Sequence, residues 1–267
     1  MIPNVLSIAG SDPSGGAGIQ ADIKTISANG AFAMAAITAL TAQNTQGVTG
    51  IHFVPPDFVQ SQIGTVFADI RVDAVKIGMI ANADIAAAVA RSLQRQPGVP
   101  IVLDPVMIAK GGAALLHPDA VITLRDTLLP MATLLTPNLP EAAHLLGTSA
   151  ATTREEMFDQ GAALCALGPQ AVLMKGGHLA GPESPDCLVT DRDVMWFEAA
   201  RTQTSNTHGT GCTLSSALAA QLARGKTPAA ATAVAKSYVA NAIANAGALS
   251  VGTGQGPTHH FAALYSN

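Results

Sequence analysis

The sequence predicts an α/β fold in which helices cover both faces of a central, mostly parallel sheet with a small hairpin at its edge. Short apolar strands alternate with helical segments along most of the chain, which is the order typical of parallel sheets. Glycines and polar residues gather after the strands and not before them, which indicates a single ligand-binding edge. The 267 residues are 48% hydrophobic, enough for a large core, and no linker or repeat divides them. We therefore expect one domain over residues 1–267.

Composition argues against several classes of protein. The formal net charge is −4 and the chain has no block of Lys and Arg, so it lacks the basic surface that nucleic-acid binding requires. The cysteines Cys165, Cys187 and Cys212 are odd in number and have no CxxC spacing, which argues against a disulfide framework or a zinc cluster. Neither a signal peptide nor an apolar run of transmembrane length is present. We expect a soluble, cytoplasmic protein with no membrane contact.

The chain begins with a strand, a glycine-rich loop and a helix. An apolar strand is expected at residues 5–9, and the loop over residues 10–18 contains four glycines. The spacing of Ile19, Ile23 and Ile26 predicts a helix with one buried face. Such a dense run of glycines favours a close approach of the backbone to a ligand over a merely flexible turn.

A second apolar strand over residues 32–40 leads into the polar segment 41–47. Polar side chains at the carboxyl end of a strand lie where open α/β sheets bind ligands. The amide of Gln43 can donate and accept hydrogen bonds at once, which suits the edge of a nitrogen heteroaromatic ring. A surface loop built from ordinary turn residues explains the same segment equally well.

The middle of the chain continues the alternation and places charged side chains after strands. Asp104 ends a strand and precedes a proline, a position typical of a metal or phosphate site, although a simple Asp-Pro turn also explains it. Lys175 ends another strand beside two glycines, where it can neutralise a phosphate, and an exposed lysine is the alternative. Helices are expected at residues 55–69, 82–96, 119–129 and 153–167, and Asn82 is the expected N-cap of the second. Strands are expected at residues 72–79, 100–107, 132–136 and 171–178.

A further helix is expected between Asn138 and Gly147, with Glu141 in its first turn. Glu141 is explained as a capping acid, but its place beside a second strand end also makes it a candidate catalytic group. Strands at residues 186–190 and 194–199 then form the edge hairpin, and a last helix over residues 228–246 carries Lys236.

The segment 206–216 has the composition of an anion-binding helix start. Gly209, Thr210 and Gly211 precede a run rich in Ala and Leu, so the first N–H groups of that helix have no intrahelical partner and attract anions. Cys212 lies in the first turn, where the helix dipole favours the thiolate. This arrangement suggests phosphoryl chemistry. A capped helix with a buried cysteine is the plainer alternative.

Several of these segments resemble one known family. They are similar to motifs of the hydroxymethylpyrimidine/phosphomethylpyrimidine kinases of thiamine biosynthesis, which belong to the ribokinase-like superfamily of three-layer sandwich folds. The resemblance covers nearly the whole chain and is specific because the motifs occur together. They lie at residues 9–22, 38–45, 76–79, 136–142, 172–178, 206–212 and 256–261.

The resemblance implies ATP-dependent phosphorylation of 4-amino-5-hydroxymethyl-2-methylpyrimidine, followed by phosphorylation of the monophosphate to the pyrophosphate. It also implies magnesium and a homodimer. Family roles carry over to the matching positions. Gln43 and Asp22 would bind the aminopyrimidine and its hydroxymethyl arm, and the walls around the ring would be formed by Gly10, Ala17, Met79 and Val106. Asp104 and Glu141 would hold Mg²⁺ directly or through water, and the residues at the nucleotide would be Asn138, Lys175 and Lys236.

One position departs from the sugar kinases of this superfamily, which usually have Asp where this chain has Cys212. The identity of the general base is therefore open between Cys212 and Asp22. Our hypothesis is that Cys212 orients the hydroxyl and takes its proton, while the N–H groups of residues 209–211 stabilise the phosphoryl group in transfer.

Two other functions fit parts of the pattern. A pyridoxine or pyridoxal kinase of the same fold would also act on a hydroxymethyl group of a nitrogen heteroaromatic ring. A non-catalytic pyrimidine-binding protein would keep Gln43 but would not need Asp104, Glu141 and Lys175. Because all three charged residues are present, the catalytic interpretation is preferred.

Overall fold

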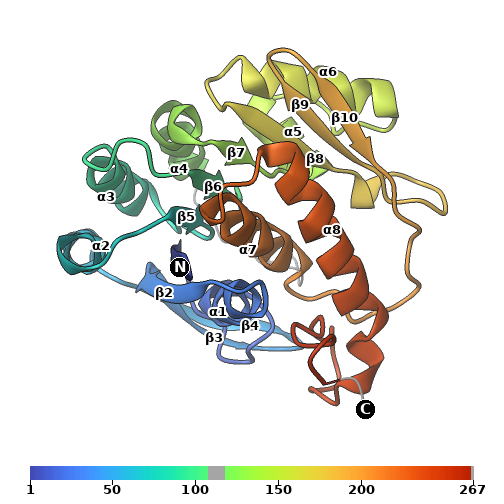
Figure 1. Cartoon of the computed structure of the whole chain (residues 1–267), viewed down its shortest axis with the longest axis horizontal. Helices are drawn as coiled ribbons and strands as arrows, with labels where there is room; N and C mark the ends of the chain where they lie inside the picture. Colours follow the sequence, from blue (N-terminus) through green and yellow to red (C-terminus); the bar gives the residue numbers. More distant parts are fainter. Residues whose placement is uncertain (108–117, 266–267) are drawn as a thin grey trace.

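The protein is built on one eight-stranded sheet, seen edge-on in Figure 1. The structure is a computed structural model that describes residues 1–107 and 118–265. Neighbouring strands are parallel from β8 to β2, whereas β9 and β10 form an antiparallel edge. The order is β10 (Val194–Phe197), β9 (Asp186–Thr190), β8 (Ala171–Lys175), β7 (Leu134–Leu135), β6 (Ile101–Leu103), β5 (Ala74–Ile77), β1 (Asn4–Ala9) and β2 (Phe32–Ile37). The mostly parallel sheet and its edge hairpin are confirmed.

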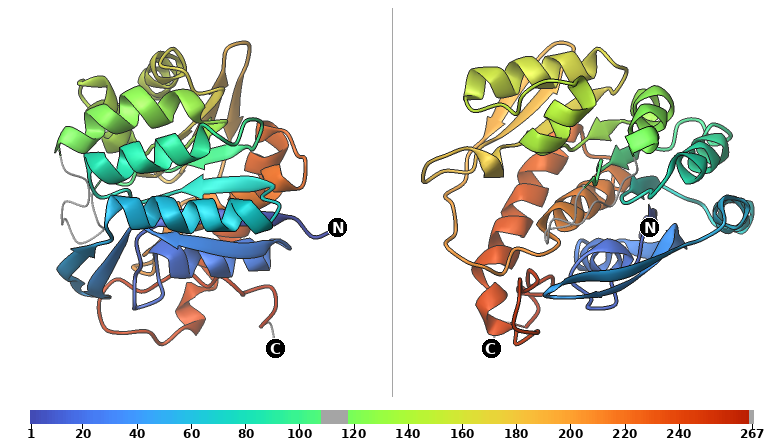
Figure 2. Two further views of the ribbon diagram at one scale, coloured as in Figure 1. Left: turned by 90° about the vertical axis from the view of Figure 1, so that its left-hand side faces the viewer. Right: turned by 180° about the vertical axis from the view of Figure 1, so that it is seen from behind.

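Helices cover both faces of this sheet and give a three-layer sandwich (Figures 1 and 2). One layer contains α1 (Gly18–Ala28), α7 (Thr210–Ala223) and α8 (Pro228–Ala244). The other contains α2 (Pro56–Asp69), α3 (Ala83–Leu93), α4 (Pro118–Thr123), α5 (Leu139–Leu146) and α6 (Arg154–Cys165). Within residues 1–107 and 118–265, every helix is too short or too polar to span a bilayer.

Alternation along the strands assigns side chains to the two helical layers. In β1, Leu6 and Ile8 pack toward the layer of α2 to α6, whereas Val5 packs toward α1 and α7. Ser7 and Lys76 fall on the α1 and α7 side, and both are completely buried. Polar side chains therefore lie inside the core on one face of the sheet only a few residues from the carboxyl ends of β1 and β5.

A second, two-stranded sheet projects from the edge at which the parallel strands end (Figure 2). The single strand predicted over residues 32–40 is wrong, because the chain leaves the main sheet after Ile37. The buried Thr38 bonds to the carbonyl oxygens of two other segments: its N–H donates to Ala9 and its hydroxyl to Met79. This ends β2, and the chain continues as β3 (Ala39–Asn44), which pairs with β4 (Gly47–Phe53).

Gln43 consequently lies on a strand and not in the loop that the sequence predicts. The pairing of β3 with β4 shifts register between Ala42 and Gln43, which is a β-bulge. Strand β4 contains two glycines and little apolar alternation, so nothing in its sequence competes with a loop assignment. Pairing between the two segments satisfies backbone groups that a loop would leave to water.

The other predicted elements are present, but several strands are shorter than predicted: β6 ends at Leu103 and not at residue 107, and β7 contains only Leu134 and Leu135. Asn82 caps α3 by accepting the N–H of Ile85, and Gly147 ends α5 in the left-handed conformation with φ of 68°. The helix expected at residues 119–129 is α-helical only to Thr123 and continues as a π-helical turn. Ile23 is 39% exposed, so the buried face of α1 is narrower than its isoleucine spacing predicts.

Replacing Asn82 with Ala is expected to destabilise the protein by about 1 kcal/mol, because the N–H of Ile85 loses its acceptor at the start of α3. For a chain of this size that corresponds to a thermal midpoint lower by roughly 2–4 °C. Gln94→Ala at the other end of α3 is the control, since Gln94 is exposed and its side chain makes no hydrogen bond within the described residues. Equal midpoints for the two variants would contradict the capping role.

Candidate active site

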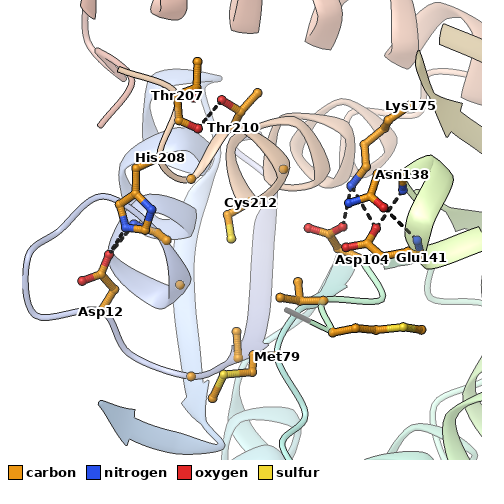
Figure 3. A pocket seen from close by; sticks show the side chains of 18 of the residues that line it. Asp12, Met79, Asp104, Asn138, Glu141, Lys175, Thr207, His208, Thr210 and Cys212 are labelled. Carbon is orange, nitrogen blue, oxygen red and sulfur yellow. Dashed lines mark hydrogen bonds and ion pairs between the residues drawn. The ribbon is translucent and has the colours of Figure 1, made fainter. Parts of the chain in front are cut away.

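A cavity of about 860 Å³ opens at the carboxyl ends of the parallel strands and beside the β3–β4 hairpin. Most of the residues that the sequence singles out line it (Figure 3). They are Gly10, Ala17, Gln43, Met79, Asp104, Val106, Asn138, Glu141, Lys175, Gly209, Thr210, Gly211 and Cys212. Segments as far apart in the sequence as Gly10 and Cys212 thus share one small volume. Asp22 and Lys236 are not among the residues that line it.

The start of α7 forms the cradle that the sequence predicts. Gly209 has a φ of 76°, and a side chain there would collide with the carbonyl oxygen of Gly16, so the loop after β1 packs directly against it. No hydrogen bond among the described residues occupies the N–H groups of Gly211 and Cys212. The N–H of Thr210 instead lies 3.3 Å from the carbonyl oxygen of Thr207. The N–H of Gly209 is likewise unoccupied within the described residues, so the available donors are two of the three predicted N–H groups together with that of Cys212.

Lys175, Asp104 and Glu141 form a charged cluster on one side of the cradle (Figure 3). The Nζ atom of Lys175 lies 3.0 Å from Oδ1 of Asp104 and 3.7 Å from Oε2 of Glu141. Burial lowers the pKa of Lys175, but the two carboxylates more than reverse this and hold it above its ordinary value. Burial would also raise the pKa of Asp104, yet Lys175 and Lys76 keep that carboxyl below its usual range. Burial raises the pKa of Glu141 to about 7.

Asn138 and Glu141 begin α5 with a complete capping box. Oδ1 of Asn138 accepts the N–H of Glu141 at 2.8 Å, and Oε2 of Glu141 accepts the N–H of Asn138 at 2.7 Å. Both interpretations of Glu141 are therefore compatible, because the same carboxylate caps the helix and faces Lys175 in the cavity.

Cys212 lies between the charged cluster and the hairpin side of the cavity (Figure 3). The sequence predicts a thiolate at this helix start, whereas the surroundings of Cys212 favour the neutral thiol. Burial raises the pKa of the Cys212 thiol to about 11, and the ammonium of Lys76 only partly offsets the effect. Near neutral pH the group is therefore a thiol, because removing it from water costs more than the helix terminus and the nearby cation return.

Asp22 lies below the floor of the cavity and is not part of its wall, which corrects its expected contact with the substrate. It is completely buried, and both of its oxygens accept hydrogen bonds from Nζ of Lys76, at 2.9 and 2.8 Å. Hydroxyl groups of Ser7 and Ser216 also donate to it. Burial lowers the pKa of Lys76, but the negative charge of the Asp22 carboxylate more than reverses this effect. The pKa of Lys76 therefore lies above its ordinary value. A carboxylate that accepts four hydrogen bonds from three donor groups is not placed to act as a base.

Lys236 is not among the residues that line the cavity, and its place at the nucleotide stays a prediction. Its Nζ atom donates to Asp186 at 2.6 Å and to the carbonyl oxygen of Ser184 at 2.8 Å. Asp186 is 6% exposed and in turn accepts the N–H of Gly176. The lysine therefore links α8 to the edge hairpin and to the glycine turn after β8.

Three residues in the site escape the sequence analysis as individual candidates. Lys76 lines the cavity from β5, and Asp12 and His208 line it from two different loops. Nε2 of His208 lies 2.8 Å from Oδ2 of Asp12 and 3.4 Å from the amide of Gln43. The available signals were a lysine inside an apolar strand, an aspartate in a glycine-rich loop and a histidine directly before the Gly209 turn.

These features define a class of protein. A ligand-sized cavity combines an anion-binding helix start, a lysine with two carboxylates and an amide that can read a ring edge. Together with the three-layer sandwich this is the site of a ribokinase-like small-molecule kinase.

The comparisons with known proteins identify the family. A family model for phosphomethylpyrimidine kinase matches residues 12–259, and the chain belongs to this family. It is 55% identical to the hydroxymethylpyrimidine/phosphomethylpyrimidine kinase of Escherichia coli K12 over 98% of each chain. The fold is similar to that of Bacillus subtilis pyridoxal kinase solved with ADP, with a TM-score of 0.92, 34% identity and full coverage of both chains. Phosphomethylpyrimidine kinase from Clostridium difficile 630 has a TM-score of 0.81 and 42% identity, covering 90% of this chain and 99% of that one.

Replacing Lys76 with Met is expected to destabilise the fold by about 3–5 kcal/mol, because it leaves the buried carboxylate of Asp22 without its counter-charge. The double variant Asp22→Asn/Lys76→Met removes both charges and should recover most of the loss. Urea midpoints of the two variants test this, with Lys226→Met at an exposed position as the control. If the double variant were no more stable than Lys76→Met, the ion pair would not be the cause.

Cys212 should react slowly with iodoacetamide at pH 8, about a hundredfold slower than in denatured protein, because only the thiolate attacks. The rate should rise with an apparent pKa near 11. Since folding favours the neutral thiol, its contribution to stability is complete below about pH 9 and is lost as the pH rises toward 11. Mass-spectrometric mapping separates Cys212 from Cys165 and Cys187. If the alkylation rate of Cys212 rose with a midpoint at or below pH 8.5, the neutral thiol would be contradicted and the thiolate favoured.

Proposed function

We propose that this protein transfers the terminal phosphoryl group of ATP to the hydroxymethyl group of 4-amino-5-hydroxymethyl-2-methylpyrimidine and then phosphorylates the monophosphate. The observation that carries the proposal is that Gln43 and Cys212 line the same cavity. A relative in Escherichia coli with 55% identity over nearly the whole chain is named for both of these kinase activities. Gly10, Ala17, Met79 and Val106 line the cavity as well and offer the ring a mostly apolar wall.

The roles of the residues follow from their positions. Gln43 binds the polar edge of the ring, and the N–H groups at the start of α7 stabilise charge on the phosphoryl group as it moves. Lys175, held by Asp104 and Glu141, offers its ammonium to the phosphates. Asn138 meets the nucleotide from the start of α5.

Proton transfer is the smaller part of this catalysis. A neutral thiol at Cys212 and an ion-paired Asp22 leave neither residue ready as a strong base. Phosphoryl transfer proceeds through a loose transition state in which positioning and charge stabilisation dominate. We therefore assign to Cys212 the orientation of the substrate hydroxyl by a hydrogen bond.

The donor set fits magnesium. Within the described residues no three His, Cys, Asp or Glu side chains form a metal cluster, whereas Asp104 and Glu141 offer two carboxylates in the cavity. Magnesium is commonly held by one or two carboxylates together with substrate phosphates and water. Bound there, the ion would neutralise charge on the phosphates of ATP.

Three broader expectations belong to the same proposal. The continuous sheet supports a single domain over residues 1–267. The exposed apolar side chains of Phe32, Leu40 and Phe53 on β2, β3 and β4 support a homodimer that covers them. Cytoplasmic location is consistent with a kinase that consumes ATP.

An assay that couples ADP release to NADH oxidation, with product analysis by mass spectrometry, tests the activity. We expect turnover of the aminopyrimidine alcohol and of its monophosphate, with formation of a pyrophosphate product. Pyridoxal is the comparison substrate, because the fold closely matches that of a pyridoxal kinase. Exclusive turnover of pyridoxal, or no ATP consumption with any of the three, would overturn the proposal.

Replacing Lys175 with Met should lower kcat by about 10²–10³, because the phosphates lose the cation beside Asp104. Lys226→Met makes the same chemical change on the exposed surface and should leave kcat unaffected. A Lys175→Met enzyme with unchanged kcat would remove this lysine from the mechanism.

A further inference from the structure

Asp12 is an ionised carboxylate that can only accept hydrogen bonds. It is 1% exposed, and Oδ1 accepts from the N–H and the hydroxyl of Ser14, at 2.9 and 2.7 Å. Oδ2 accepts the N–H of Ala17 at 2.8 Å. Burial would raise the pKa of Asp12, but the hydrogen bonds from His208 and Ser14 keep it below its ordinary value. His208, whose Nε2 lies 2.8 Å from the same Oδ2, must therefore carry a proton on Nε2 and donate it.

This proton decides which way the amide of Gln43 faces. One end of the amide lies 3.4 Å from Nε2 of His208, and the other lies 3.2 Å from the hydroxyl oxygen of Thr41. That hydroxyl has a single proton, which it donates to the carbonyl oxygen of Ser11 at 2.8 Å, so its lone pairs are what remain for Gln43. Nε2 of His208 thus has no lone pair for Gln43 and can only share the N–H that it donates to Asp12, whereas Thr41 offers an acceptor.

Both contacts favour the same orientation. The two ends of an amide have the same shape, so hydrogen bonding assigns them. With the nitrogen toward His208, two N–H donors would face each other. With the carbonyl oxygen toward His208 and the nitrogen toward Thr41, the amide nitrogen donates to Thr41, and the carbonyl oxygen shares the N–H that His208 donates to Asp12. His208 is 8% exposed and also fixed by its backbone, whose N–H donates to Gly256, so the group that directs the amide is itself held in place.

We propose that the Asp12–His208 pair holds the Gln43 carbonyl on the side of the cradle and thereby selects substrates with a hydrogen-bond donor next to the reacting hydroxymethyl group. His208 directly precedes Gly209, so the end of the amide nearest His208 is the end nearest the phosphoryl cradle. The reacting hydroxymethyl group must point to that cradle. The ring substituent beside it then meets the carbonyl oxygen, and the next ring atom meets the amide N–H.

The chemistry of the aminopyrimidine matches this arrangement, and the inference rests on the proposed function in that respect. Its 4-amino group lies next to the hydroxymethyl group and donates, and its ring N3 accepts. In the 4-oxo analogue both properties are exchanged, because oxygen replaces the amino group and N3 carries a proton. Pyridoxal likewise presents a formyl oxygen at this position, which would face the Gln43 carbonyl.

Selectivity between the 4-amino alcohol and its 4-oxo analogue tests the proposal. The unmodified enzyme should prefer the 4-amino compound by at least about a hundredfold in kcat/KM. In His208→Leu the amide is free to rotate, and this ratio should fall about tenfold. His208→Gln can still donate to both Asp12 and Gln43 and should keep the ratio. His52→Leu, on the exposed face of the same hairpin, is the matched control.

A purely structural role for His208 would lower kcat/KM for both compounds alike and leave their ratio unchanged, and that result would overturn the proposal. A second measurement does not depend on turnover. Long-range ¹H–¹⁵N NMR should show Nε2 of His208 protonated from pH 6 to pH 9, and an unprotonated Nε2 would also overturn it. If the unmodified enzyme phosphorylates neither compound, the proposed function fails, which is a different outcome from an unchanged ratio.

Discussion

The ion pair between Lys76 and Asp22 holds together the elements that carry the site. Lys76 comes from the middle of β5 and Asp22 from α1, and the hydroxyl groups of Ser7 on β1 and Ser216 on α7 donate to the same carboxylate. Two strands and two helices thus meet at one charged point with no exposure to solvent. Buried charges are costly unless they are fully paired, so the four elements are constrained to one relative arrangement. The cavity lies directly above this point.

The arrangement above the pair separates two tasks. Charged groups that meet phosphates, Lys175 with Asp104 and Glu141, come from strand ends and a helix start within the main body of the fold. The group that reads the ring, Gln43, comes from the separate hairpin. The start of α7 lies between them and contacts both sides, because Gly211 lies close to Asp104 and His208 reaches Gln43. Recognition of the ring and transfer of the phosphoryl group therefore meet at a single helix terminus.

Local patterns predict this fold well because each buried element has a strong period or cap. The strand ending in Asp104, the capping box of Asn138 and the edge hairpin all follow from nearest neighbours in the sequence. The errors arise where distant contacts decide. Thr38 ends β2 through bonds to two other segments, and the desolvation of Cys212 depends on what packs over it. The substrate role expected for Asp22 comes from the family resemblance, and no local pattern reveals its ion pair because Lys76 is 54 residues away.

The bulge between Ala42 and Gln43 has a consequence for how the binding site can change over time. Side chains on a strand alternate between its two faces, and the extra residue decides which face each later side chain joins. The register places the extra residue, Thr49, on β4, so its loss would shift β4 by one residue against β3 while leaving the eight-stranded sheet untouched. Because the hairpin lies outside the main sheet, a short insertion or deletion in β4 changes the strand that supports Gln43 at little cost to folding, and new ligand preferences are accessible at this point.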